Sequence, residues 1–199
     1  GNVKYLGRTI NHQWSKSFEF EEMFRKYSKK YLVKEIEYFS FLRPLYEIQI
    51  SKLFSKMDKY FSSIRSCNVG QKENIWCCNC PKCLSTYILL FPFVGKEKMR
   101  KIFPEDLFEK ENLYDILELL VLDEKVKPFE CVGTRQELKL ALAMSIIKLN
   151  DDLPLLLRKI KPILGNIDKI ISDNKHILKS WGENNLDNKI YDLPEKYQF

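Results

Sequence analysis

Cysteines crowd the stretch Trp76-Cys77-Cys78-Asn79-Cys80-Pro81-Lys82-Cys83, and Ser66-Cys67-Asn68 adds one more a short way upstream. Two overlapping Cys-x-x-Cys steps let one loop offer three sulfurs to a single ion, and Cys67 supplies the fourth. Four thiolates close a tetrahedral zinc site and leave no open position for chemistry. The sequence therefore predicts a structural zinc-binding loop over residues 62–83, with the ligands Cys67, Cys77, Cys80 and Cys83.

The remaining cysteine of this stretch, Cys78, lies beside a predicted ligand, where geometry disfavours a second bond to the same ion. It receives no role, although it could substitute for Cys67. Buried free thiols are the alternative to a metal site. Three disulfides fit poorly, because disulfide scaffolds are short and secreted, whereas this chain has 199 residues and is rich in lysine. A bound zinc ion would contribute about 10 kcal/mol to local folding.

Composition and charge are those of an ordinary globular chain, with 45% hydrophobic and 30% charged residues. The longest apolar stretch, 84–94, is too short to span a bilayer, and Pro92 interrupts it. No basic-then-apolar leader opens the chain, so we expect a cytoplasmic protein without a membrane partner. The net charge of +6 is interleaved with acidic residues, which favours solvated helix faces over a nucleic-acid surface.

The length allows one domain with a proper core, or the C-terminal portion of a larger enzyme. The chain begins with Gly1 rather than Met, which indicates a piece of something longer. We therefore expect residues 1–199 to form a single domain or such a portion. Within it, 62–83 would be the zinc-binding loop and 150–199 a helical C-terminal extension.

Hydrophobic patterning predicts a mainly α chain with two or three short strands. Ser17 fits a helix N-cap, and Thr134-Arg135-Gln136-Glu137 fits a capping box. Alternation predicts a strand at 35–41, and 127–133 is expected to be a loop with an extended start. Helices are expected at 17–32, from Pro44 to about 61, and at 84–93, 96–102, 113–120, 134–149, 153–161 and 167–181.

Two of these helices are expected to bury an apolar stripe. In the first helix, Phe20, Phe24 and either Tyr27 or Tyr31 would face inward. In the second helix, the inward positions would be Ile50, Leu53, Phe54, Met57 and Phe61. The segment 84–93 is apolar on all sides, so it is expected to be a buried helix.

The densest polar run near the start of a helix is Asn11-His12-Gln13-Trp14-Ser15-Lys16-Ser17. Free N–H groups at a helix N-terminus bind phosphate or carboxylate. His12 has the chemistry of a general base. A single loop histidine is more often structural or solvated, however, and the residues by themselves favour that interpretation.

Two further places present polar groups. Arg43 either clamps a carboxylate or phosphate bidentately or forms an i,i+4 salt bridge with Glu47 worth roughly a few tenths of a kcal/mol, and spacing does not choose between them. Glu130 and Cys131 lie just before Gly133, where a loop can present them to a site. Two acid/base groups on opposite faces of a carbon suit racemisation. A solvated carboxylate and a buried thiol are the simpler interpretation.

These separate pieces occur in one order along the chain: Asn11-His12-Gln13-Trp14-Ser15-Lys16-Ser17-Phe18-Glu19-Phe20-Glu21, Tyr38-Phe39-Ser40-Phe41-Leu42-Arg43-Pro44-Leu45-Tyr46-Glu47-Ile48-Gln49-Ile50, Ser66-Cys67-Asn68, Trp76-Cys77 … Cys80-Pro81-Lys82-Cys83 and Lys127-Pro128-Phe129-Glu130-Cys131-Val132-Gly133. Together they resemble the UDP-N-acetylmuramoyl-L-alanyl-L-glutamate epimerase family, from about Asn11 to Leu142. Two departures are Cys78, where glycine is expected, and Thr134, where an acidic residue is expected.

The resemblance implies an isomerase of peptidoglycan precursor synthesis in the cytoplasm. Such enzymes use ATP and Mg²⁺ to invert the terminal L-glutamate of UDP-MurNAc-L-Ala-L-Glu to D-glutamate. The implied route adenylates the glutamate carboxylate and releases pyrophosphate. A base then removes the α-proton, a proton returns on the other face, and hydrolysis releases AMP.

The same resemblance implies where the chemistry lies. His12, Glu130 and Cys131 are the candidates for proton transfer. The candidates for binding the substrate or the nucleotide are Asn11, Lys16, Arg43 and Glu47. Zinc would be structural, held by the four cysteines named above.

The family is similar to the ATP pyrophosphatases, and this implies the C-terminal part of an α/β ATP pyrophosphatase-like fold with a four-cysteine zinc loop. Their Ser-Gly-Gly-x-Asp-Ser type nucleotide loop does not occur in this sequence. We therefore expect a partner region upstream that binds the nucleotide, or a reduced relative. The alternatives are another ligase of this group, of the deazaguanine synthase type, and a non-catalytic zinc-stabilised module that binds nucleic acid.

Overall fold

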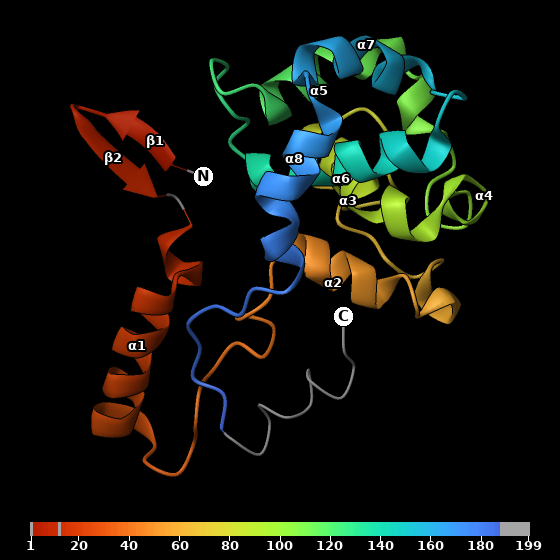
Figure 1. Ribbon diagram of the computed structural model, residues 1–199. Helices are drawn as coiled ribbons and strands as arrows, with labels where there is room; N and C mark the ends of the chain where they lie inside the picture. The colour runs from red at the N-terminus through yellow and green to blue at the C-terminus, as the bar shows by residue number, and fades with distance from the viewer. Residues whose placement is uncertain (1, 12, 188–199) are drawn as a thin grey trace. The chain divides into compact units, whose positions relative to one another are not determined.

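The computed structural model describes residues 2–11 and 13–187 (Figure 1). Most of these residues are helical, which confirms the predicted mainly α class. The chain divides into two compact units. Unit 1 is Gly1–Tyr46 with Ser180–Phe199, and unit 2 is Glu47–Lys179. Among the described residues the only sheet is a two-stranded hairpin, so the relation to the ATP pyrophosphatase fold stays a prediction.

Unit 1 begins with a β-hairpin that the sequence did not predict. Strand β1 (Asn2–Tyr5) pairs antiparallel with β2 (Arg8–Asn11), and the turn between them is Leu6-Gly7. Both turn residues have positive φ, 46° at Leu6 and 72° at Gly7, as a two-residue hairpin turn requires. Leucine seldom adopts this conformation, which explains why the turn carries no recognisable signal.

The first helix of unit 1 runs where it was expected but buries a different face. After η1 (Trp14–Lys16), α1 (Phe18–Tyr27) continues into a π-helical segment, η2 (Ser28–Leu32). Ser17 is the N-cap, as predicted, because its Oγ accepts from the Phe20 N–H at 3.1 Å. The predicted burial of Tyr27 or Tyr31 is wrong, because these rings are 52% and 61% exposed. The buried side chain of α1 is instead Glu21.

The predicted strand at 35–41 is also wrong. This segment pairs with no other strand in the described part of the chain. It lies instead along α1, where Arg25 donates to the Tyr38 carbonyl at 2.7 Å and the Ser40 N–H donates to Glu21 Oε2 at 3.1 Å. The Phe24 and Tyr38 rings add an edge contact, with centroids 4.7 Å apart. The helix therefore supplies the hydrogen-bond partners that a neighbouring strand would have provided.

Unit 2 is built from helices and short 3₁₀ turns. In chain order these are α2 (Glu47–Phe54), η3 (Asp58–Tyr60), α3 (Pro81–Val94), α4 (Lys96–Met99), η4 (Leu107–Glu109), η5 (Glu111–Leu113), α5 (Tyr114–Val121), α6 (Arg135–Leu149), α7 (Leu155–Leu164), α8 (Ile167–Asn174) and η6 (Lys175–Leu178). Helix α2 begins three residues after Pro44 rather than at it. It buries Ile48 and Gln49, whereas Met57, predicted to be inward, is 47% exposed.

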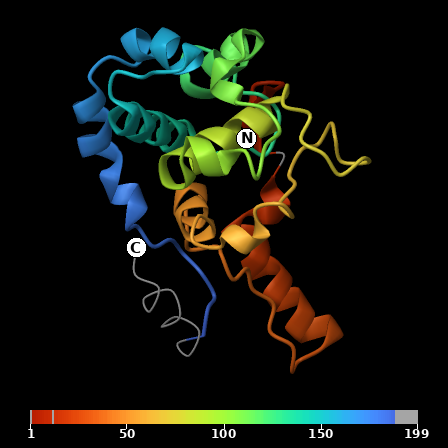
Figure 2. The ribbon, with the colours of Figure 1, turned by 90° about the vertical axis from the view of Figure 1, so that its right-hand side faces the viewer.

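Helix α3 lies at the centre of unit 2. As predicted it is buried on nearly all sides, and it contacts α2, α4, α5 and α6 (Figures 1 and 2). An aromatic cluster packs on it, with Tyr87 4.9 Å from Phe108 and 5.2 Å from Phe103 between ring centroids. The Tyr87 hydroxyl donates to Asp106 at 2.8 Å, which satisfies its one buried polar atom.

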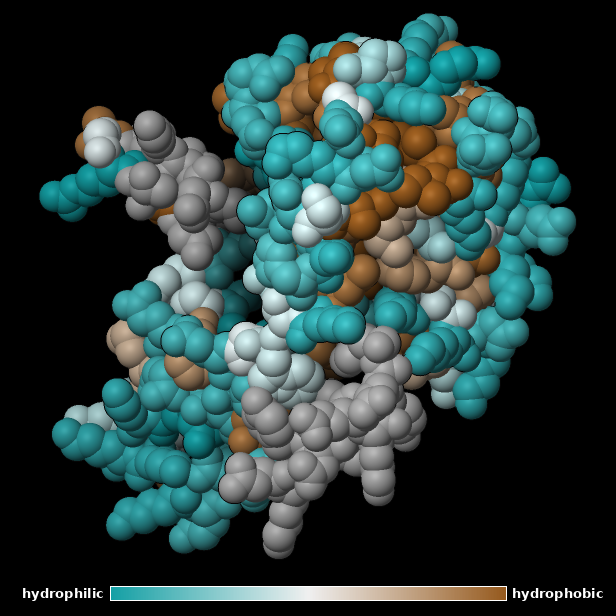
Figure 3. Space-filling model, viewed as in Figure 1, coloured by the Kyte–Doolittle hydropathy of each residue, from teal (hydrophilic) through white to brown (hydrophobic). Residues whose placement is uncertain are grey.

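Helix α6 packs along α3 and starts with the predicted capping box. Thr134 Oγ1 accepts from the Glu137 N–H, and the Glu137 carboxylate accepts from the Thr134 N–H at 2.9 Å. Leu138, Ala141 and Leu142 are buried on the side of α6 that faces the core. Apolar side chains reach the surface over α6, between α7 and α8 (Figure 3). No helix among the described residues is long and apolar enough to cross a membrane.

Candidate metal centre and the loop beside it

Four cysteine sulfurs converge at the N-terminus of α3. The Sγ atoms of Cys67, Cys77, Cys80 and Cys83 all lie within 4.8 Å of one another. Three of the separations are shorter still, at 3.9 Å for Cys67–Cys80, 3.7 Å for Cys77–Cys83 and 3.5 Å for Cys80–Cys83. The structure thus brings together the four cysteines that the sequence predicts as ligands.

The spacing of these sulfurs fits a zinc ion. With zinc–sulfur bonds of about 2.3 Å, the sulfurs of a tetrahedral site lie about 3.8 Å apart. The separations of 3.5–3.9 Å agree with that edge length. Such a site would be closed, because four thiolates leave no position for substrate or water.

Backbone groups support the sulfurs. The N–H groups of Gly70 and Cys77 donate to Cys67 Sγ at 3.1 and 3.4 Å, and the Cys83 N–H donates to Cys80 Sγ at 3.4 Å. Cys80 is the N-cap of α3, where the helix dipole favours a thiolate. Its hydrogen bond with the Cys83 thiol lowers the pKa of Cys80 to about 5 against the effect of burial. The site therefore favours at least one thiolate before any metal binds.

The loop that carries Cys67 is shaped by close packing. A Cβ on Gly70 would lie 2.4 Å from the Ile75 carbonyl oxygen, so no larger residue fits there without a shift. Trp76, next to the ligand Cys77, packs against Phe103 with the rings tilted and their centroids 4.4 Å apart. The metal loop is thereby anchored to the aromatic cluster on α3, and Figure 2 shows it (yellow) running into that helix.

Cys78 is not part of the sulfur cluster. It is fully buried and has a φ of 55°, the left-handed conformation that glycine adopts without strain. Burial, followed by the negative charge of Glu105, raises the pKa of its thiol to about 11. This backbone geometry explains why glycine is the residue expected at position 78.

A loop of residues 127–133, between α5 and α6, lies against α3 in unit 2. Lys82, which stands between two of the ligands, donates to the Cys131 carbonyl. Further along α3, Ser85 Oγ accepts from the Gly133 N–H at 3.2 Å. Lys127 closes the loop by donating to the Val132 carbonyl at 3.2 Å and the Gly133 carbonyl at 2.6 Å.

This arrangement places Glu130 and Cys131 beside the metal centre. Both side chains are half-buried. Asn68, next to the ligand Cys67, donates to Glu130 Oε2 at 3.5 Å. Burial, with the negative charge of Cys80, raises the pKa of Glu130.

Glu47, the first residue of α2, lies at the other end of the same loop. A methyl group on Gly133 would be 3.6 Å from Glu47 Oε2 and 3.1 Å from Leu89 Cδ1, so the loop approaches both α2 and α3 closely. Lys127 is partly buried, and burial, with the charge of Arg135, lowers its pKa against the opposing pull of Glu47 and Glu137. Three predicted site residues, Glu47, Glu130 and Cys131, therefore lie on or beside one loop.

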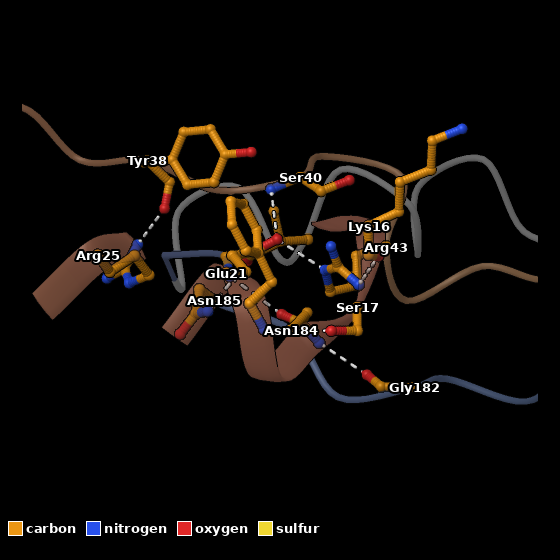
Figure 4. Close-up of polar contacts among 12 residues, drawn as sticks. Lys16, Ser17, Glu21, Arg25, Tyr38, Ser40, Arg43, Gly182, Asn184 and Asn185 are labelled. Carbon is orange, nitrogen blue, oxygen red and sulfur yellow. Dashed lines mark hydrogen bonds and ion pairs between the residues drawn. The ribbon is translucent and has the colours of Figure 1, made fainter. Parts of the chain in front are cut away.

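Arg43 belongs to unit 1, and its carboxylate partner is Glu21 (Figure 4). Arg43 Nε donates to Glu21 Oε2 at 2.6 Å, and its Nη1 donates to the Lys16 carbonyl at 3.1 Å. Glu21 is 1% exposed and also accepts from Asn185 Nδ2 at 3.0 Å. Burial alone would raise the pKa of Glu21, but the bonds from Asn185 and Arg43 outweigh it and lower the pKa.

The other predicted site residues of unit 1 are Asn11, His12 and Lys16. Lys16 ends η1 with an exposed side chain, and its backbone carbonyl is the one that meets Arg43. Asn11 ends β2, opposite Asn2. His12 lies outside the described residues. The roles assigned to these residues stay predictions.

Several residues of these sites escaped the sequence analysis. Glu21 sits in a run of acidic residues typical of an exposed helix start, and nothing local marks it as buried. Lys82, Ser85 and Lys127 are ordinary residue types whose partners lie far along the chain. The one usable signal was position, because Lys82 stands between two predicted ligands.

Comparison with known proteins agrees with the resemblance of the motifs. The family model described as the MurL C-terminal domain matches residues 60–160, and the one described as the MurL N-terminal domain matches residues 1–41. This chain belongs to the MurL family. The first match covers the metal centre, α3 and the loop 127–133, and the second covers α1 with Lys16.

Curated relatives in the MurL family carry one name, UDP-N-acetyl-alpha-D-muramoyl-L-alanyl-L-glutamate epimerase. The protein of Xanthomonas oryzae pv. oryzae is 35% identical over 68% of this chain and 31% of its own length. Those of a Micromonospora species and of Salinispora tropica are 38% and 36% identical over 72% of this chain, and over 33% and 32% of their own lengths. The chain thus spans about a third of the relatives that it matches. No solved structure matches it.

Proposed function

We propose that this chain is part of an epimerase that inverts the terminal L-glutamate of UDP-MurNAc-L-Ala-L-Glu in peptidoglycan precursor synthesis. The observation that carries the proposal is the identity of 35–38% to three proteins named for that activity, over 68–72% of this chain. The substrate would be a nucleotide-linked muramoyl dipeptide, and the reaction would take place in the cytoplasm.

The proposed route uses ATP and Mg²⁺. A carboxylate activates its α-hydrogen poorly, because its negative charge opposes the formation of a second negative charge on the neighbouring α-carbon. Attack of the glutamate carboxylate on the α-phosphorus of ATP forms an acyl adenylate and releases pyrophosphate. One base then removes the acidified α-proton, and an acid returns a proton on the opposite face. Water then cleaves the acyl adenylate, which regenerates the carboxylate of the peptide-linked D-glutamate and releases AMP.

Within this chain the loop 127–133 supplies the candidates for proton transfer. Glu130 and Cys131 are adjacent protic groups on a backbone that is fixed by side chains of α3 and by Lys127. Fixed placement is what general acid–base catalysis requires, since proton transfer needs hydrogen-bond distances. His12 is a third candidate. Asn11, Lys16, Arg43 and Glu47 are proposed to bind substrate or nucleotide.

Zinc is proposed to act as a structural element. When bound, it supplies a rigid cross-link between Cys67 and the first turn of α3, with no open position for the reaction. Cys67, Cys77, Cys80 and Cys83 would hold it.

The activity is tested on the full-length protein that contains this chain. Purified protein is incubated with UDP-MurNAc-L-Ala-L-Glu, ATP and Mg²⁺, and the hydrolysed product is analysed for D-glutamate while AMP is quantified. We expect both products in the complete mixture and neither when ATP is omitted. Complete mixtures that yield no D-glutamate would reject the proposal, and D-glutamate without AMP would reject the adenylate route.

The proton-transfer residues are tested by Glu130→Gln and Cys131→Ser, with Glu124→Gln as the matched control on an exposed side chain of unit 2. In D₂O the wild type is expected to incorporate deuterium at the glutamate α-carbon. Loss of one proton-transfer group typically costs 10²–10⁴-fold in rate, so at least one of the two variants is expected to fall by about that factor. Equal rates in all three variants would exclude both residues.

A further inference from the structure

The first turns of α3 carry both metal ligands and the side chains that bind the loop 127–133. Cys80 and Cys83 belong to the sulfur cluster, and Lys82 stands between them with its ammonium group on the Cys131 carbonyl. We propose that Lys82 is a positioning residue that couples the metal centre to this loop, so that loss of the metal releases Glu130 and Cys131 from their places.

Hydrogen bonds from other segments hold the C-terminal end of the loop. The loop forms no helix or strand, so its backbone groups are satisfied by turns within the loop and by side chains. The carbonyls of Cys131, Val132 and Gly133 receive the ammonium groups of Lys82 and Lys127, and the Gly133 N–H reaches Ser85. Helix α3 therefore fixes the loop at Cys131 and at Gly133, on either side of Val132.

A second contact runs from the other part of the metal loop. Asn68 follows the ligand Cys67, and its amide donates to Glu130 Oε2 at 3.5 Å. Glu130 and Cys131 are thus each held by a residue adjacent in sequence to a metal ligand. Both contacts depend on where the sulfur ligands place their neighbours, which is the geometry that a bound ion would enforce.

Loss of the ion would act through the first turn of α3. Four thiols that lie within 4.8 Å of one another are held together by weak contacts once no metal bridges them. The loop that ends at Cys80 has little other secondary structure, so this turn would loosen and carry Lys82 away from the Cys131 carbonyl. That the loop performs chemistry rests on the proposed function, whereas its attachment to α3 does not.

Amide hydrogen exchange on the zinc-loaded full-length protein tests the coupling without any assay of activity. The reporters are the Val132 and Gly133 amides, which are bonded to the Glu130 carbonyl and to Ser85. Removing zinc with a chelator is expected to speed their exchange about tenfold or more, together with exchange in 67–83. Faster exchange in 67–83 with no change at Val132 and Gly133 would overturn the proposal.

Variants then separate Lys82 from the metal itself. Lys82→Met keeps the aliphatic stem and removes the donor, and it is expected to retain a full equivalent of zinc while Val132 and Gly133 exchange about tenfold faster. Lys82→Arg keeps a donor and should restore part of the protection. Lys101→Met changes an exposed lysine of unit 2 and should alter neither measurement.

Two results would count against a role directed at the loop. One is unchanged protection of Val132 and Gly133 in zinc-loaded Lys82→Met, and the other is loss of zinc from that variant. Should Lys82→Met fail to fold, the chelation experiment and Lys82→Arg decide the question without it.

Kinetics link the coupling to the reaction. In an active full-length enzyme, Lys82→Met is expected to lower kcat about tenfold or more with KM for ATP unchanged, because it displaces Glu130 and Cys131 and not the nucleotide. Lys82→Arg should recover part of kcat, and an unchanged kcat in Lys82→Met would overturn the catalytic half of the proposal. A wild-type enzyme without epimerase activity would reject the proposed function and leave the exchange result standing.

Discussion

The backbone N–H of Ile48 donates to Glu137 Oε1 at 3.1 Å, across 89 residues of sequence. The other oxygen of this carboxylate accepts from the Thr134 N–H at 2.9 Å, in the capping box of α6. One side chain, 2% exposed, therefore satisfies N–H groups at the start of two helices. Because α2 and α6 share this anion, they are fixed to each other at their positive ends.

Glu137→Ala is expected to destabilise unit 2 by about 3 kcal/mol, because it leaves the buried Ile48 N–H and the partly buried Thr134 N–H without an acceptor. Glu137→Gln keeps one acceptor oxygen and should cost less. Gln136→Ala is the control, on the exposed neighbour. The measurement is amide exchange in α2 and α6. A change confined to α6 would mean that the bond to Ile48 contributes nothing.

Glu21→Gln is expected to destabilise unit 1, because it leaves the Arg43 guanidinium, 17% exposed, beside a neutral group. Loss of about 3 kcal/mol corresponds to exchange about 100-fold faster in the amides of α1. The neighbour Glu22 is partly exposed, so Glu22→Gln should change little. Equal effects of the two substitutions would show that the ion pair between Glu21 and Arg43 does not stabilise unit 1 more than an exposed carboxylate does.

Acid is expected to break the hydrogen bonds and the ion pair of Glu21 by protonating its carboxylate. The pKa of Glu21 in the folded chain lies below its usual value of 4.5. The stabilisation is therefore fully present above pH 4.5 and is lost as the pH falls through the lower, folded-state pKa. NMR signals of Asn185, whose amide meets Glu21, should shift with a midpoint below 4.5. The transition should be absent in Glu21→Gln, and a midpoint above 4.5 would contradict the assignment.

Zinc content distinguishes the ligands from their neighbour. We expect one zinc per chain in the wild type and in Cys78→Ser, and little zinc in Cys80→Ser. The reason is that Cys80 belongs to the sulfur cluster and Cys78 does not. Metal analysis after gel filtration gives the answer. Full zinc retention in Cys80→Ser, or loss of zinc from Cys78→Ser, would show that the ligand set is wrong.

Cys78→Gly is expected to be milder than Cys78→Ala, although alanine is closer in size. Both substitutions remove a buried thiol, but glycine relieves the strain of φ 55° and alanine keeps it. That strain is worth about 1–2 kcal/mol, which offsets most of the lost packing in the glycine variant alone. Thermal denaturation of the two zinc-loaded variants checks the order. A more stable Cys78→Ala would mean that the strain is negligible.

Features that depend on neighbouring residues could be predicted from the sequence. The cysteine spacing led to the sulfur cluster, the apolar run led to α3, and Thr134 with Glu137 led to the start of α6. In the capping box the partners lie within a few residues of each other. In the sulfur cluster and in α3, one type of residue accounts for the feature. Such features can be read from a single sequence because nothing distant has to be known.

The predictions failed mainly where a residue bonds to a segment far along the chain. The acidic start of α1 looks solvent-facing, yet Glu21 is buried because Arg43, Ser40 and Asn185 arrive from other segments. Residues 35–41 alternate like a strand but bond to α1. The turn at Leu6 lacks the asparagine or glycine expected at that position, so the hairpin was missed. For Glu21 and for residues 35–41, the missing information was which distant group would supply the hydrogen bond.

The bond from the Gly182 N–H to the Pro44 carbonyl, 2.9 Å long, joins the two segments of unit 1 just before the chain enters unit 2 and just after it returns. Inside unit 2, α2 at its start contacts η6 at its finish. Unit 2 is thus an insertion within unit 1, and its first and last helices contact each other. Residues 47–179 should be separable by gene truncation, and a short Gly-Ser bridge in their place should let the flanking segments reassemble.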